Sequence, residues 1–134
     1  MNTTKLVLGV VAAIIVAFLA GWLLGASGKR TAERALGATT LQTDLVLARG
    51  SVLTARVDLY NVNFGDASRH LEEARGRLRT AQAQLKDLGR QDDVTRLERA
   101  LGKVEEATRM AAKLDQGANS RAAEAVAAID EVGR

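Results

Sequence analysis

Cysteine and proline are both absent from this 134-residue sequence, and its aromatic residues are one tryptophan, one tyrosine and two phenylalanines. Without cysteine the chain can form neither disulfides nor thiolate metal sites. Without proline, and with many Ala, Leu, Glu and Arg residues, long helices are favoured over sheet. The sequence therefore predicts an all-α fold.

Histidine is almost absent as well, because His70 is the single example. His70 and Glu73 form H-x-x-E, whereas carboxylate-bridged metal sites in helical bundles use Glu-x-x-His twice. The flanking Arg69 and Arg75 favour a surface histidine. No phosphate loop, nucleophile elbow or metal-binding helix signature occurs. We therefore predict a non-enzymatic protein with no catalytic residue, no cofactor and no metal.

A large excess of one charge is also missing. The chain has 19 Lys and Arg against 16 Asp and Glu. Lys5 is the only charged residue before Lys29, so 18 basic residues face 16 acidic ones afterwards, a surplus of +2. The densest basic stretch is interleaved with Glu72 and Glu73 and lacks aromatic residues for base stacking. The composition therefore predicts no nucleic-acid binding.

The one long hydrophobic run extends from Leu6 to Leu24 and contains no charge. At ~1.5 Å per residue a helix of this length reaches about 28 Å, close to the hydrocarbon thickness of a bilayer. After a short flank, residues 1–5, the sequence thus predicts a single transmembrane helix over residues 6–26. A cleaved signal peptide is the alternative, but the run is longer than a usual signal core.

The flanks of this run predict its orientation. Lys5 precedes it, whereas Lys29, Arg30 and Arg34 follow it, and Trp22 lies near its end as a membrane-interface residue. Basic residues concentrate on the cytoplasmic side of membrane helices. We expect a bacterial-type inner-membrane protein whose C-terminal domain is cytoplasmic, with a periplasmic domain as the alternative.

Small residues recur at every fourth position of the run, which lets the backbone of another membrane helix approach closely. The alternative is that an alanine-rich chain places small residues everywhere. We call this set the small-residue ridge; it comprises Gly9, Ala13, Ala17, Gly21 and Gly25.

Residues 27–37 are predicted to form a boundary segment and a stalk. From Ala38 onward the apolar residues have heptad spacing. A corner is predicted at Asn63–Asp66, with Gly65 as a left-handed helix end and Asp66 as the next helix cap. Leu88 and Gly89 mark a second stop, and the sequence leaves open whether residues 91–132 form one helix or two. Residues 38–134 thus predict an antiparallel three- to four-helix bundle with coiled-coil-like seams. The first seam comprises Ala38, Leu41, Leu45, Ala48, Val52, Ala55, Leu59 and Val62.

A second apolar stripe lies on the first helix of this bundle, away from the heptad seam. Such a stripe is explained either by a central helix touched by two others of its own chain or by a docking face for a partner. The candidate partner-contact residues are Val46, Leu53, Val57, Tyr60 and Phe64.

Together these patterns predict an accessory or scaffold subunit anchored in the lipid bilayer. Its expected partners are the integral membrane helices of a larger protein complex, of which a respiratory or photosynthetic bioenergetic complex is one class. The alternative is a self-associating signalling or spacer coiled coil, so a homo-oligomer stays open. Heptads broken by short turns favour folding within one chain.

Overall fold

The computed structural model describes the backbone of residues 3–134 and the side chains of residues 14–18 and 31–134. It contains four helices in the order α1 (Thr3–Tyr60), α2 (Phe64–Asp87), α3 (Gln91–Ala112) and α4 (Gly117–Asp130). The described backbone contains no strand, and the all-α prediction is confirmed. The chain divides into two compact units, Met1–Ala38 and Thr39–Arg134.

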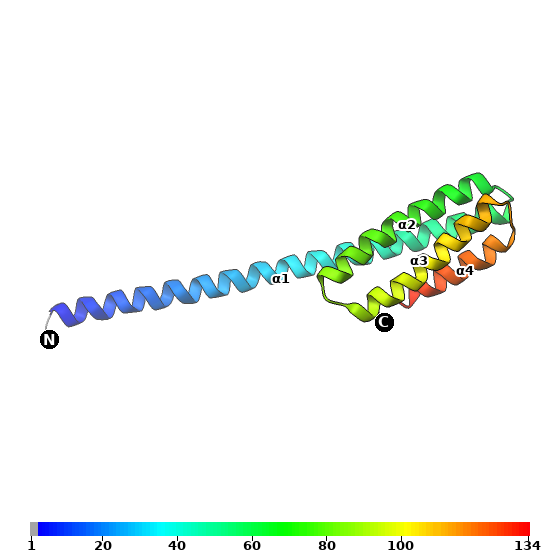
Figure 1. The fold of residues 1–134 in the computed structure, drawn as a ribbon. Helices are drawn as coiled ribbons and strands as arrows, with labels where there is room; N and C mark the ends of the chain where they lie inside the picture. The colour runs from blue at the N-terminus through cyan, green and yellow to red at the C-terminus, as the bar shows by residue number, and fades with distance from the viewer. Residues whose placement is uncertain (1–2) are drawn as a thin grey trace. The chain divides into compact units, whose positions relative to one another are not determined.

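The second unit is an antiparallel four-helix bundle (Figure 1). Helix α2 packs against α3, and α3 packs against α4. Helix α1 lies between α2 and α4, because Asp44 accepts a 3.0 Å hydrogen bond from Gln84 of α2 and Arg49 lies 2.8 Å from Asp130 of α4. The predicted bundle is therefore confirmed, and residues 91–132 contain two helices.

Alanine and leucine fill the core of the bundle. In α2 the fully buried residues alternate between the two types, and the small alanines allow neighbouring helices to approach closely. The heptad positions of α1 from Leu41 to Leu59 are buried as expected. Ala38 is exposed. The buried residues of α2 are Ala67, Leu71, Ala74, Leu78, Ala81 and Leu85.

The seam predicted for α1 includes Val62, but Val62 is exposed. Leu88 and Leu114 likewise continue the apolar spacing of α2 and α3, and both are exposed. All three residues lie beyond the ends of their helices. Their spacing is therefore that of a core residue, whereas their position is that of a turn residue.

The turn from α1 to α2 closes by a pair of backbone hydrogen bonds typical of helix C-termini. The N–H of Asn63 donates to the carbonyl of Asp58 at 2.8 Å, and the N–H of Val62 donates to that of Leu59 at 3.1 Å. The residue in the left-handed conformation is Val62, with φ 62°. The expectation of Gly65 in this role is wrong, because Gly65 lies inside α2.

The cap of α2 also differs from the expectation. Asn63 is the N-cap, and its side chain accepts a hydrogen bond from the backbone N–H of Asp66. Asp66 is therefore the residue that is capped and not the cap. An asparagine oxygen suits this role because it satisfies an N–H of the first turn that has no partner within the helix.

The predicted transmembrane helix lies in the first unit. Most of its side chains are outside the described residues. The described side chains there include residues 14–18, all of which are exposed. Among the described residues no helix carries a stretch that meets the length and hydropathy needed to cross a membrane. The transmembrane helix over residues 6–26 therefore stays a prediction.

Candidate binding surface

The second apolar stripe divides into buried and exposed members in the structure. Leu53 and Phe64 are partly buried and pack against the core. Val46, Val57 and Tyr60 are exposed by 56%, 60% and 81%. Phe64 is the first residue of α2 and does not belong to α1. Internal packing therefore explains part of the stripe, whereas three of its side chains have no such explanation.

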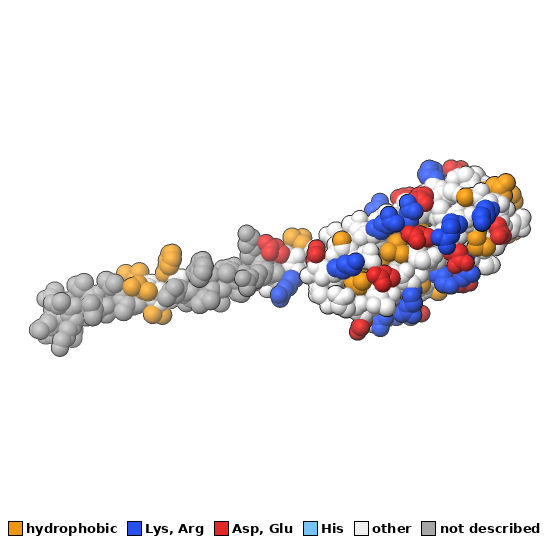
Figure 2. Space-filling view, viewed as in Figure 1, with side chains coloured by type: hydrophobic (Ala, Val, Ile, Leu, Met, Phe, Trp, Pro, Cys, Tyr) orange, Lys and Arg blue, Asp and Glu red, His pale blue; other side chains and the backbone are white. Residues whose placement is uncertain are grey.

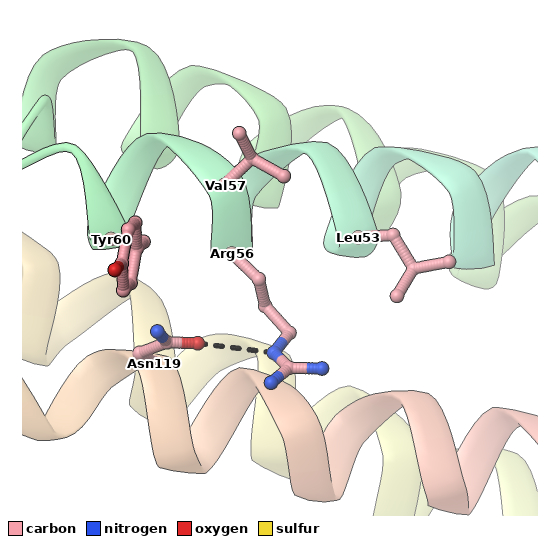
Figure 3. Close-up of a pocket in the computed structure, with 5 residues that line it drawn as sticks. All are labelled: Leu53, Arg56, Val57, Tyr60 and Asn119. Atoms are coloured by element: carbon pink, nitrogen blue, oxygen red, sulfur yellow. Dashed lines mark hydrogen bonds between the residues drawn. The ribbon is translucent and has the colours of Figure 1, made fainter.

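A depression forms where this stripe meets α4 (Figure 3). Its volume is about 370 Å³, and α1 supplies Leu53, Arg56, Val57 and Tyr60 to its lining. Helix α4 supplies Asn119, whose side-chain oxygen accepts a hydrogen bond from Arg56 Nε at 3.0 Å. We call this the α1–α4 pocket. It combines an apolar lining with one cation and one amide.

A smaller depression of about 130 Å³ lies on the same two helices. Arg49 and Asp130 line it together with Val46. Here Arg49 Nε donates to a carboxylate oxygen of Asp130 at 2.8 Å. The two depressions thus each contain an arginine from α1, but only Arg49 faces an anion across the interface.

The interface between α1 and α2 is polar at its edge. Asp44 of α1 accepts from Gln84 and lies 3.6 Å from Arg77. His70 Nε2 lies 3.7 Å from Asp58 Oδ2, and His70 Nδ1 lies 3.7 Å from Glu73 Oε2. The side chain of His70 is 20% exposed, so this histidine is half-buried at the edge of the interface.

The described residues contain no group of His, Cys, Asp and Glu suited to hold a metal ion. Metal sites in helical bundles need several such ligands converging from facing helices. The Asp44–Arg77 and Arg49–Asp130 ion pairs link neighbouring helices.

Ion pairs on the surface of the bundle lie both within one helix and between helices. Glu73 and Arg77 of α2 lie 3.8 Å apart, and Arg96 pairs with Asp93 within α3. Glu105 of α3 pairs with Arg79 of α2. Such exposed pairs contribute little to stability. On the face of the bundle shown in Figure 2, basic and acidic side chains are interspersed.

Asp93 is the buried charged residue among the described side chains. Its carboxylate accepts hydrogen bonds from Arg90 at 2.8 Å, Arg96 at 3.1 Å and the backbone N–H of Gly133 at 3.0 Å. Burial alone would raise the pKa of Asp93, but the Gly133 hydrogen bond and the two arginines outweigh it and lower the pKa. Asp93 therefore ties the start of α3 to the end of the chain.

Most predicted membrane residues lie outside the described side chains. These are Lys5, Trp22, Lys29 and Arg30 at the interface, with Gly9, Ala13, Gly21 and Gly25 of the small-residue ridge. Ala17 of that ridge and Arg34 of the interface are described, and both are exposed.

Sequence reasoning missed Arg56 and Asn119. They are separated by 63 positions and meet only because α1 and α4 pack side by side. One signal did exist, since Arg49 and Arg56 are seven residues apart and therefore lie on the same face of a helix. No pattern in the sequence indicates which residue of α4 each arginine faces.

The comparisons with known proteins identify no relative. No family model matches the chain, and neither a curated protein nor a solved structure matches it.

Proposed function

We propose that this protein is a non-enzymatic accessory or scaffold subunit, anchored in a membrane by its N-terminal helix, that binds and stabilises a larger membrane protein complex. The anchor is the uncharged run from Leu6 to Leu24, and the scaffold is the bundle Thr39–Arg134. A respiratory or photosynthetic bioenergetic complex is one class of partner that fits this proposal.

The observation that supports the proposed membrane anchor is the exposure of residues 14–18. The exposed fractions of Ile14, Ile15, Val16 and Phe18 are 62%, 53%, 66% and 76%. Successive helical residues are about 100° apart, so this segment is apolar and exposed around its whole circumference. Burial of side chains of this size is worth about 1.5–3 kcal/mol each. Lipid or a partner helix supplies that burial in the proposal.

The alternative of a self-associating coiled coil is less well supported. Its heptad seams would have to pair between chains, yet Leu41 to Leu59 of α1 are already buried in the core of one chain. A seam that is filled within one chain is not available for pairing with a second copy. The accessory-subunit proposal requires no such pairing, because its contacts use the membrane segment and the remaining exposed side chains.

A substitution in the small-residue ridge tests the proposal. Gly21→Leu places a large side chain where close helix approach is proposed, so it should release the protein from its complex in mild detergent. Native electrophoresis would measure the size of the complex. Ala26→Leu is the matched control, because it adds a leucine side chain about 140° from Gly21 and about 100° from Gly25 around the helix. Retention of the complex by Gly21→Leu would contradict the proposal.

The absence of cysteine makes the proposed cytoplasmic orientation simple to test. Ser120 is exposed near the start of α4, so Ser120→Cys introduces one reactive thiol on the bundle. A membrane-impermeant maleimide should label this thiol only after cells are lysed. Labelling in intact spheroplasts would place the bundle in the periplasm.

A further inference from the structure

The α1–α4 pocket contains a cation, Arg56, that has no carboxylate within ion-pair distance among the described side chains. Arg56 is partly buried, and its Nε donates to Asn119, which is neutral. The other partly buried arginines among the described side chains each lie within ion-pair distance of a carboxylate. These are Arg49, Arg75, Arg77, Arg96 and Arg121.

The geometry of Arg56 determines which of its atoms can bind a ligand. The hydrogen bond to Asn119 holds Nε and therefore orients the plane of the guanidinium (Figure 3). The two terminal nitrogens are the donors that remain, and a pair of such N–H groups matches the two oxygens of a carboxylate. A partly desolvated guanidinium gains more from an ionised acceptor than from an amide.

The rest of the pocket is apolar. Leu53, Val57 and Tyr60 line the pocket together with Arg56 and Asn119, and a volume of about 370 Å³ falls within the range of small-molecule sites. A free inorganic anion would leave these three side chains uncovered. A neutral apolar compound would leave the charge of Arg56 unmatched. The lining therefore suits a molecule that has both an anionic end and a compact apolar end.

We propose that the α1–α4 pocket binds a small organic carboxylate that carries an apolar or aromatic group. The carboxylate lies on the terminal nitrogens of Arg56, and the apolar group covers Leu53, Val57 and Tyr60. A helix of a partner protein fits less well, because the Arg49–Asp130 pair interrupts the apolar row along the same interface. This site is independent of the proposed membrane partner.

The probe for the test is 4-phenylbutanoate, added to the full-length protein in a neutral maltoside detergent. Tyr60 is the only tyrosine of the chain, so its ring resonances report on the pocket without ambiguity. We expect saturable shifts of these resonances. The neutral analogue 4-phenylbutanamide should bind about tenfold more weakly or worse, because it cannot form the charged hydrogen bonds.

Arg56→Gln should weaken binding of 4-phenylbutanoate by about tenfold or more, since it removes the charge. Arg49→Gln is the matched control and should leave the affinity unchanged, because Arg49 faces Asp130 in the neighbouring depression. Asn119→Asp is a second variant, and it leaves Arg56 in place. It supplies a carboxylate to Arg56 and should also weaken binding by about tenfold.

Four results would overturn the proposal. The first is an absence of saturable shifts in the Tyr60 resonances. The second is equal affinity for the acid and the amide. The third is an affinity for 4-phenylbutanoate that neither Arg56→Gln nor Asn119→Asp changes. The fourth is a dimer in sedimentation experiments that Asn119→Asp dissociates, since a second copy of the chain would then be the occupant of the pocket.

Discussion

Val62 combines a β-branched side chain with a backbone conformation that such residues rarely adopt. Its φ is 62°, and its side chain is 58% exposed, so packing offers little compensation. Leu114 is in the same situation at the turn from α3 to α4, with φ 58°. The left-handed region costs an L-residue other than glycine roughly 1–2 kcal/mol. The turn between α2 and α3 avoids this cost, because its left-handed residue is Gly89.

Val62→Gly should therefore stabilise the bundle. We expect its free energy of unfolding to rise by about 1 kcal/mol, because relief of strain exceeds the added freedom of the unfolded chain. Urea unfolding followed by circular dichroism measures the change. Val62→Ala keeps the Cβ atom and should give a smaller gain. An unchanged or lower midpoint for Val62→Gly would show that the turn stores no such strain.

Asp93→Asn should destabilise the bundle, because the substitution removes the charge that Arg90 and Arg96 contact. Hydrogen bonds to charged groups contribute about 1.5–3 kcal/mol, and we expect a loss in that range at neutral pH. Asp92→Asn is the control. Asp92 is exposed in the same first turn, so its substitution should cost only a few tenths of a kcal/mol.

The effect of Asp93 should also depend on pH. Its pKa is lowered in the folded protein, so its contribution to stability is present above the unfolded-state pKa of about 4. That contribution is lost as the pH falls through the lower folded-state pKa. Stability curves of the natural protein and of Asp93→Asn should therefore converge in acid. A constant difference between the two curves across this pH range would contradict the assignment.

At the scale of the element, glycine has opposite effects on stability within a helix and just beyond the end of a helix. Gly76 is exposed in the middle of α2, and nothing lies within 4 Å of an added Cβ. Gly89 also has open space around it, but its φ is +69°. The two positions therefore differ in backbone conformation and not in steric crowding by neighbouring atoms.

Gly76→Ala should raise the free energy of unfolding by about 0.5–1 kcal/mol, because alanine loses less backbone freedom in a helix. Gly89→Ala should lower it by about 1 kcal/mol, because alanine is strained in the left-handed region. The two variants are matched controls, and thermal or urea unfolding compares them directly. A change of the same sign in both would refute the explanation.

Also at this scale, the helices were predictable and their exact ends were not. Heptad spacing correctly predicts the buried face of α1 from Leu41 to Leu59, because the same periodicity governs which side of a helix is apolar. The spacing continues through Val62, Leu88 and Leu114, although each lies in a turn. Periodicity cannot register a helix end when the turn residue is itself apolar. Gly65 misled the prediction for the converse reason, since a glycine can lie within a helix.

At the scale of the whole molecule, the second compact unit contains a core of its own. The core draws residues from all four helices, and the unit begins at Thr39. We therefore expect residues 31–134 to fold without the N-terminal segment, to sediment as a monomer and to unfold in one cooperative transition. A melting temperature that rises with protein concentration would instead indicate association between chains.

The sequence by itself determined the all-α class, the buried face of α1 and the location of the uncharged N-terminal run. These properties depend on composition and on spacing along one helix, which are local. Only the tertiary structure decided that α4 is a separate helix beside α1, and that Arg56 meets Asn119 while Arg49 meets Asp130. Such pairings depend on the axial offset of two packed helices. That offset is set by how the alanines and leucines of all four helices interlock in the shared core, and not by any one segment.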